Sequence, residues 1–140
     1  MVYADSSCLV AMVAVEPRTS DVVQWLASQS EEAVLSADWC VTEVASALSI
    51  KVRTGQLSST LADAAWNEFE SACDGLLRLV SVESRDFVLA ARFCRVFDAG
   101  LRAGDALHLA VALRLKCRTM WSLDRNLNLN ARAHGMLTLH

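Results

Sequence analysis

Short apolar segments alternate along the chain with segments in which apolar residues recur every three or four positions. The short segments have the length and apolar content of buried strands, and they cover residues 1–4, 33–36, 76–82, 119–123 and 136–139. The periodic segments predict helices, over residues 7–14, 17–28, 38–53, 57–74, 85–97, 104–113 and 125–133. Strands that alternate with helices form mainly parallel sheets covered on both faces. The pattern therefore predicts an α/β fold with three layers, α/β/α, around a mainly parallel sheet of four to five short strands.

The segment over residues 104–113 differs from the other predicted helices because it is apolar on nearly every side. A helix without a polar face is normally buried in the middle of a domain. Its first turn carries Asp105, so we expect this carboxylate at the floor of a cleft, with Gly104 or Asp105 capping the helix. An aspartate in a first turn is also an ordinary helix start, and Asp105 alone does not indicate a site.

Three further acidic residues occupy comparable positions. Asp5 follows the first predicted strand directly, Asp124 follows the fourth, and Glu43 lies at the edge of the buried side of the helix after the second. Ligands of open parallel sheets bind beyond the carboxyl ends of the strands. We therefore expect Asp5, Glu43, Asp105 and Asp124 to converge on one cleft.

Four carboxylates in a partly dehydrated cleft repel one another, and a hard divalent cation relieves this repulsion. Oxygen ligands with retained water suit Mg²⁺, with Mn²⁺ as a substitute. Asp5 and Asp105 are the expected main ligands, and Asp124 completes the same shell or holds a second ion. Such a site can hydrolyse a phosphodiester bond. In this reaction Glu43 binds the second ion or orients the water that attacks the phosphate.

Composition sets limits on the remaining possibilities. The 140 residues fit a single domain over residues 1–140. The net charge is −3, and if four of the sixteen acidic residues surround a metal, the excess of negative charge is concentrated at that site. The five cysteines are odd in number and widely spaced, which indicates neither a disulfide framework nor a zinc site. The longest apolar run, over residues 8–15, is too short to span a membrane. We expect a cytoplasmic protein.

Four segments carry a family resemblance: Val-Tyr-Ala-Asp-Ser-Ser, Thr-Glu-Val-Ala-Ser-Ala-Leu, Gly-Asp-Ala-Leu-His-Leu-Ala and Ser-Leu-Asp-Arg-Asn-Leu, which begin at residues 2, 42, 104 and 122. Each motif alone has little specificity, but the ordered set, at this spacing, resembles the four signatures of the PIN domain. The resemblance spans essentially the whole chain. A PIN protein of this length resembles the VapC toxins of bacterial and archaeal toxin–antitoxin pairs.

The resemblance implies an Mg²⁺-dependent endoribonuclease whose catalytic and metal-binding quartet is Asp5, Glu43, Asp105 and Asp124. It also implies inhibition by a VapB-type antitoxin and a homodimer formed through helices near the second strand and the fourth helix. The fourth acidic position, here Asp124, varies most in the family. Two alternatives stay open: a PIN nuclease of RNA processing that is not a toxin, and a non-catalytic nucleic-acid-binding or protein-binding domain of the same fold.

Several other residues have both a functional and a structural interpretation. Ser7 can hydrogen-bond a ligand carboxylate or a metal-bound water, or it can serve only as a hydroxyl at a helix start. Arg102 and Arg125 flank two of the acids, and each is a candidate for contact with an RNA phosphate or for an ion pair with a neighbouring carboxylate. We interpret His108 as a hydrogen-bonded core residue outside the site, and the four tryptophans as core or interface residues.

Overall fold

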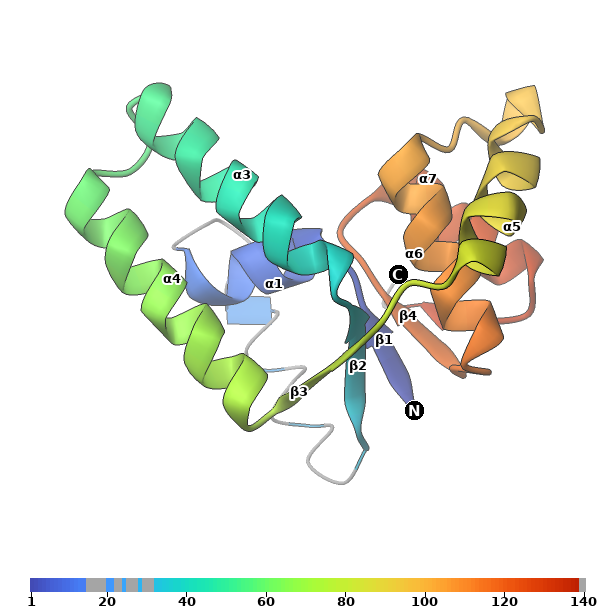
Figure 1. The fold of residues 1–140 in the computed structure, drawn as a ribbon, viewed down its shortest axis with the longest axis horizontal. Coiled ribbons are helices and arrows are strands. Elements are labelled where there is room, and N and C mark those ends of the chain that lie inside the picture. The colour runs from blue at the N-terminus through green and yellow to red at the C-terminus, as the bar shows by residue number, and fades with distance from the viewer. Residues whose placement is uncertain (15–19, 22–23, 25–27, 29–31, 139–140) are drawn as a thin grey trace.

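The computed structural model describes residues 1–14, 20–21, 24, 28 and 32–138. Its five strands form one all-parallel sheet in the order β3-β2-β1-β4-β5 (Figure 1). The strands are β1 (Val2–Ala4), β2 (Val34–Ala37), β3 (Leu77–Val80), β4 (Thr119–Trp121) and β5 (Leu137–Thr138). The predicted parallel sheet is therefore confirmed, at the upper end of the expected strand number.

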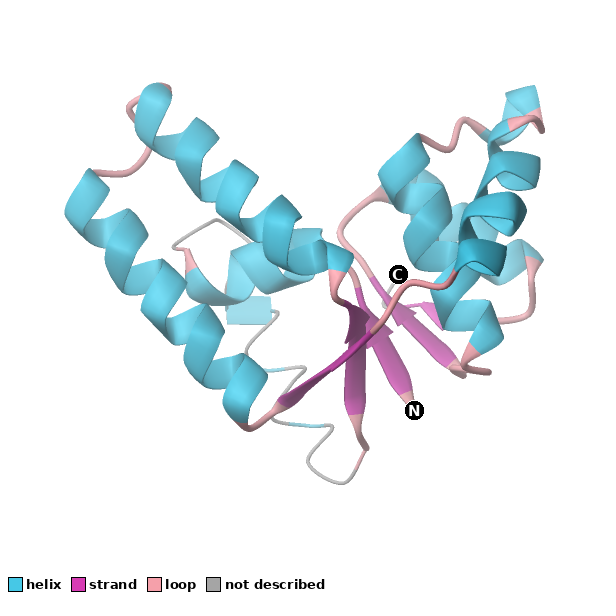
Figure 2. Ribbon diagram, in the orientation of Figure 1, coloured by secondary structure: helices cyan, strands magenta, loops and turns pink. Residues whose placement is uncertain are grey.

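Helices in the described part of the chain cover the sheet on both faces (Figure 2). One group consists of α1 (Ser6–Val13), α3 (Trp39–Arg53) and α4 (Ser59–Asp74). The other consists of α5 (Ser84–Cys94), α6 (Ala103–Arg114) and α7 (Arg125–Ala133). This arrangement confirms the predicted α/β class with helices on either side. The helix expected over residues 17–28 falls mostly outside the described residues.

The central strand β1 shows how the sheet separates two cores. Val2 and Ala4 point into the core beneath α1, α3 and α4, whereas Tyr3 between them points into the core beneath α5, α6 and α7. All three side chains are fully buried. Successive side chains of a strand point to opposite faces, so a strand covered on both faces is apolar throughout. The carboxyl end of β1 therefore opens between the two helix groups.

Several helix ends differ from the prediction by one or two residues, and the end of α5 differs by three. The helix expected over residues 85–97 ends at Cys94, and a short 3₁₀ helix (Phe97–Ala99) follows and closes at Gly100. Phe97 is 86% exposed, so a longer helix would bury little apolar surface there, and Gly100 adopts a left-handed backbone (φ 64°) that ends helical geometry.

The expectation that Gly104 or Asp105 caps α6 is wrong. The N-cap is Arg102, whose extended backbone (φ −83°, ψ 163°) precedes the first helical residue. Its carbonyl accepts from the Ala106 amide at 2.9 Å, and its side chain makes no capping hydrogen bond. Gly104 and Asp105 therefore lie inside the first turn of α6 rather than at its cap.

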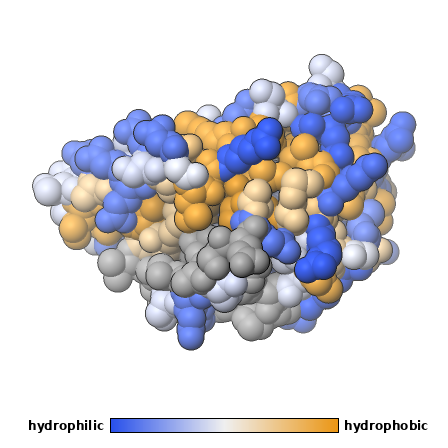
Figure 3. All heavy atoms as spheres, turned by 90° about the horizontal axis from the view of Figure 1, so that it is seen from below, coloured by the Kyte–Doolittle hydropathy of each residue, from blue (hydrophilic) through white to orange (hydrophobic). Residues whose placement is uncertain are grey.

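The surface at the amino ends of the strands carries exposed apolar side chains. Met1, Leu76 and Leu137 lie at or beside the starts of three strands and are each at least half exposed. Apolar side chains also lie between charged ones on the face seen in Figure 3. Scattered apolar exposure of this kind is ordinary for a folded chain. None of the helices in the described part of the chain has the length and apolar character needed to cross a membrane.

Arg114, the last residue of α6, binds the start of α5. Its Nε donates to Asp86 Oδ1 at 2.8 Å and Oδ2 at 3.0 Å, and its Nη2 donates to the Ser81 carbonyl at 2.9 Å. Its Nη1 lies 3.0 Å from Glu83 Oε1, and the Glu83 amide donates to Asp86 Oδ2 at 2.8 Å. Burial alone would raise the pKa of Asp86, but the hydrogen bonds from Arg114 and the Glu83 amide outweigh burial and lower it.

Replacing Arg114 by methionine should lower the free energy of unfolding by on the order of 3 kcal/mol, because Asp86 would keep a buried charge without its partner. The double variant Arg114→Met, Asp86→Asn should lose less, since no charge is then left unpaired. Urea unfolding measures both. Equal losses in the single and double variants would contradict the assignment.

The same pair predicts a pH dependence. Because folding lowers the pKa of Asp86, its stabilising contribution is complete above the unfolded pKa of about 4 and is lost as the pH falls through the lower folded value. The stability difference between the wild type and Arg114→Met should therefore shrink in acid. A difference that stays constant between neutral pH and the acid limb would contradict this account.

Candidate metal-binding active site

Three of the four predicted acids line one cleft at the carboxyl ends of the central strands. Asp5 follows β1 and Asp124 lies three residues after β4, and these strands pair side by side in the sheet. Asp105 enters from the first turn of α6. The cleft has a volume of about 510 Å³, and Arg102 lies on its wall with the three acids. Chain topology thus brings together residues that are far apart in the sequence.

Asp5 is the most enclosed of these acids, with 3% of its surface exposed. Its Oδ1 accepts from Ser7 Oγ at 2.6 Å and from the Cys8 amide at 3.2 Å, which caps α1. Its Oδ2 accepts from Ser122 Oγ at 2.7 Å. Burial raises the pKa of Asp5, although His108 and the three donors act in the opposite direction. These donors fix the orientation of the carboxylate without neutralising its charge.

Two serine hydroxyls join the ends of β1 and β4. Ser7 Oγ donates to Asp5 and accepts from the Leu123 amide at 2.9 Å. Ser122 Oγ donates to Asp5 and accepts from the Asp124 amide at 2.9 Å. Ser7 therefore contacts a candidate ligand. Our sequence analysis did not assign Ser122; its position before Leu-Asp at a strand end was the only signal.

Asp105 and Asp124 share one cation, Arg102. Arg102 Nε lies 3.5 Å from Asp105 Oδ2, and its Nη2 lies 3.6 Å from Asp124 Oδ2. The other oxygen of Asp124 accepts from the Leu127 amide at 2.7 Å and caps α7. Burial and then the charge of Asp124 raise the pKa of Asp105, and Arg102 offsets part of this effect. The guanidinium thus lowers the repulsion between the two carboxylates.

The two arginines differ in their surroundings. The Arg102 side chain is 83% exposed, and of its two interpretations the ion pair is present in the structure. Arg125 lies exposed at the first residue of α7, directly after Asp124. Arg102 lines the cleft, whereas Arg125 is not among the residues that line it.

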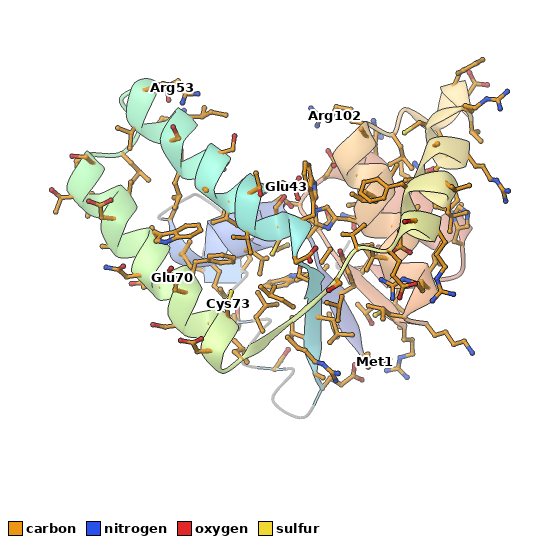
Figure 4. The ribbon with its side chains drawn as sticks, viewed as in Figure 1. Met1, Glu43, Arg53, Glu70, Cys73 and Arg102 are labelled. Atoms are coloured by element: carbon orange, nitrogen blue, oxygen red, sulfur yellow. The ribbon has the colours of Figure 1, made fainter. Side chains whose placement is uncertain are left out.

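Glu43 lies beside the cleft rather than on its wall. It lines an adjoining hollow of about 360 Å³ that shares Ser6, Ala47 and Ile50 with the main cleft. Figure 4 shows Glu43 on α3 and Arg102 at the start of α6, on opposite sides of the opening between the helix groups. The structure therefore brings three acids into one cleft and places the fourth next to it.

The reason for the position of Glu43 is His108. The Nε2 atom of this histidine is hydrogen-bonded to Glu43 Oε1, and its ring is 1% exposed. His108 is a buried, hydrogen-bonded residue, as interpreted from the sequence, but its partner is a candidate site residue. Sequence spacing gave no signal of this contact, because the two residues are 65 positions apart.

The donor set has the chemistry of a site for a hard divalent cation. All the side chains concerned offer carboxylate oxygens, which Mg²⁺ and Mn²⁺ prefer. In the described residues no group of three or more His, Cys, Asp or Glu side chains is arranged so that it could hold a metal ion by itself. Mg²⁺ retains several waters and is usually held by one or two carboxylates, so an open arrangement suits it. Burial, and after it the charge of Asp124, raises the pKa of Asp105, and a bound cation would oppose both effects.

Comparison with known proteins supports this picture at the level of family and fold. The PIN domain family model matches residues 2–133. VapC20 of Mycobacterium tuberculosis, described as a toxin that cleaves the sarcin-ricin loop, has a similar structure with a TM-score of 0.71. The two chains share 17% identity, over 98% of this chain and 97% of VapC20. A search of curated protein sequences finds no match.

Two other solved structures are similar. FitAcB of Neisseria gonorrhoeae matches with a TM-score of 0.73 and 16% identity, over 100% of this chain and 97% of the other. PAE2754 of Pyrobaculum aerophilum matches with a TM-score of 0.68 and 17% identity, over 99% and 83%. At these identities the similarity shows a shared fold. Because the family match extends over nearly the whole sequence, the chain belongs to the PIN domain family.

Proposed function

We propose that this protein is a divalent-metal-dependent endoribonuclease that acts in the cytoplasm as the toxin of a VapBC-type toxin–antitoxin pair. The observation that carries the proposal is the cleft in which Asp5, Asp105 and Asp124 gather at the carboxyl ends of adjacent parallel strands of a PIN fold. Family membership supports nuclease activity in general. The choice of RNA as substrate rests on the similarity to VapC-type proteins.

The residues divide into ligands and orienting groups. Asp5 and Asp105 would hold the first cation, Mg²⁺ or Mn²⁺, and Asp124 would complete its ligand set or hold a second. When bound, such a cation supplies a nucleophilic water at neutral pH and neutralises charge on the phosphate. Ser7 and Ser122 keep the Asp5 carboxylate aligned. Glu43, beside the cleft, would orient the attacking water or bind the second cation.

Arg102 and Arg125 would bind the substrate's phosphates. Both are exposed and lie beside candidate ligands, and guanidinium groups bind phosphate oxygens in a bidentate manner. A cation held by Asp105 and Asp124 would compete with Arg102 for these carboxylates, which would leave the guanidinium available to a phosphate. The net positive charge needed for an RNA backbone would then come from the metal and these two arginines.

The toxin role rests on the structural neighbours. One of them, VapC20, is described as a toxin. Another is described as FitAB bound to a DNA fragment. The FitAB structure matches with a TM-score of 0.71 and 17% identity, over 99% of this chain and 94% of the other. We propose that this chain is likewise held inactive by a small partner, a VapB-type antitoxin. A gene for a small DNA-binding protein directly upstream would support this pairing.

We also propose that the protein forms a homodimer. An apolar groove of about 480 Å³ lies between the start of α3, α5 and α6, and α4 contributes no residue to it. Trp39 and Phe87 on its rim are 40% and 57% exposed. A second copy of the chain would cover these side chains. This groove supports an interface at α5 and at the start of α3, whereas the family resemblance implies one through helices near the second strand and the fourth helix.

The metal-dependent activity is tested best at Asp105. Asp5 and Asp124 both cap helices, whereas Asp105 does not, so Asp105→Asn should leave the fold intact. We expect its rate of cleavage of structured RNA in Mg²⁺ to fall by at least about 100-fold, because metal-ion stabilisation of transition-state charge is worth several kcal/mol. The exposed Glu70→Gln on α4 is the matched control. Cleavage that survives both chelation and Asp105→Asn would rule out the mechanism.

The toxin role is tested in a bacterial host. Induced expression of the wild type should arrest growth, Asp105→Asn should permit growth, and Glu70→Gln should remain toxic. Growth with the active wild-type enzyme present would instead favour an RNA-processing nuclease. Growth with an inactive wild type would favour a non-catalytic binding domain.

The homodimer is tested by sedimentation velocity. Phe87→Glu should shift the wild-type mass from two chains to one, because a charge in an apolar interface is not compensated. Leu61→Glu on α4, where Leu61 is 59% exposed, should leave the dimer intact. A monomeric wild type, or dissociation by Leu61→Glu alone, would contradict the proposed interface.

A further inference from the structure

A buried chain of hydrogen bonds runs from the sheet to Glu43. The Ala37 amide donates to Tyr3 Oη at 3.0 Å, and Tyr3 Oη lies 2.7 Å from His108 Nδ1. His108 Nε2 is hydrogen-bonded to Glu43 Oε1. Tyr3 is fully buried and His108 is 1% exposed. The chain thus joins β2, β1 and α6 through buried groups and ends on α3 at Glu43, which is partly exposed.

The donors and acceptors of this chain can be assigned. A backbone amide only donates, so Tyr3 Oη accepts from Ala37 and keeps its own hydrogen for His108 Nδ1. A carboxylate only accepts, so His108 Nε2 carries the hydrogen that binds Glu43. Neutral His108 protonated at Nε2 therefore satisfies every bond, with Tyr3 selecting the tautomer.

The second carboxylate oxygen of Glu43, Oε2, lies close to Gly104, which has no side chain. A Cβ at Gly104 would lie 3.2 Å from Glu43 Oε2 and 3.6 Å from Trp39 Nε1. Gly104 has ordinary helical geometry in the first turn of α6, so its backbone does not require glycine. Glycine lowers the stability of a helix relative to alanine. The reason for a glycine at position 104 is that a larger residue would crowd the Glu43 carboxylate.

We propose that His108 and Gly104 are positioning residues for Glu43, with Tyr3 holding His108 in the tautomer that donates to the carboxylate. This inference rests on the proposed nuclease function, in which Glu43 orients the attacking water or holds an ion beside Asp105. His108, Gly104 and Asp105 all lie on α6. One rigid helix therefore sets the position of Glu43 relative to the acid on the cleft wall.

A purely structural role accounts less well for the same residues. Buried polar groups cost free energy unless every hydrogen bond is made, and an apolar side chain at position 108 would fill the core without that cost. The chain of bonds also ends on a carboxylate that is 24% exposed at the edge of the site, rather than inside the core. Its end point is thus a group that substrate can reach.

The experiment compares variants that move Glu43 with variants that do not. His108→Leu removes the donor, His108→Gln keeps an amide N–H near the position of Nε2, and Gly104→Ala adds a methyl group against Glu43. We expect His108→Leu to lower kcat for RNA cleavage about 10- to 100-fold with KM little changed, the typical effect of losing a group that orients a ligand. His108→Gln should recover most of the loss.

Gly104→Ala distinguishes positioning from stability. It should lower kcat by about 10-fold, at the lower end of the same range, while the melting temperature stays equal or rises, because alanine favours the helix. Gly75→Ala, whose added Cβ meets no atom closer than 3.8 Å, and His134→Leu on the exposed end of α7 are the controls. In a Glu43→Gln background, His108→Leu should cause no further loss.

A measurement without substrate tests the tautomer. Nitrogen NMR of the imidazole should show His108 protonated at Nε2 and not at Nδ1, and Tyr3→Phe should alter this pattern. If the wild type cleaves no RNA, the proposed function fails, and the NMR result still decides the assignment of His108. A wild-type His108 protonated at Nδ1 overturns the inference. So does full activity of both His108→Leu and Gly104→Ala in an enzyme that cleaves RNA.

Discussion

The repulsion between Asp5, Asp105 and Asp124 is the constraint around which the cleft is built. Parallel pairing of β1 with β4 and the position of the first turn of α6 at the same cleft place these like charges together, and burial raises the pKa of Asp5 and Asp105. The chain opposes this cost with the Ser7 and Ser122 hydroxyls and with Arg102. None of these groups removes a negative charge from the cleft, so the arrangement favours an additional cation.

The two sides of the site are organised differently. Asp5 and Asp124 each accept a hydrogen bond from a backbone amide of the helix that they cap, and Asp5 also accepts from Ser122 at the end of β4. Glu43 depends on a contact across the molecule, from His108 on α6. The position of the Glu43 carboxylate therefore depends on where α6 lies relative to α3.

The α/β class and most helices and strands were predictable because they depend on local hydrophobic periodicity. α7 was predicted with the observed bounds, β1 was predicted to start one residue too early, and β2 was displaced by one residue. The end of α5 and the cap of α6 were not predicted, because both depend on whether a side chain has anything to pack against. Phe97 continues the helical pattern in the sequence but finds no core, and Arg102 reaches Asp105 and Asp124 rather than the helix start.

By itself, the sequence determined the strand ends that carry Asp5 and Asp124, the apolar helix that carries Asp105, and the family to which these motifs belong. These features follow from residue order and from side-chain periodicity, which act over a few positions. Only the tertiary structure decided that Glu43 stands beside the cleft, that Ser122 binds Asp5, and that His108 connects Tyr3 to Glu43. Each of these contacts joins residues that are at least 65 positions apart, and their distances depend on how two helix groups pack on one sheet.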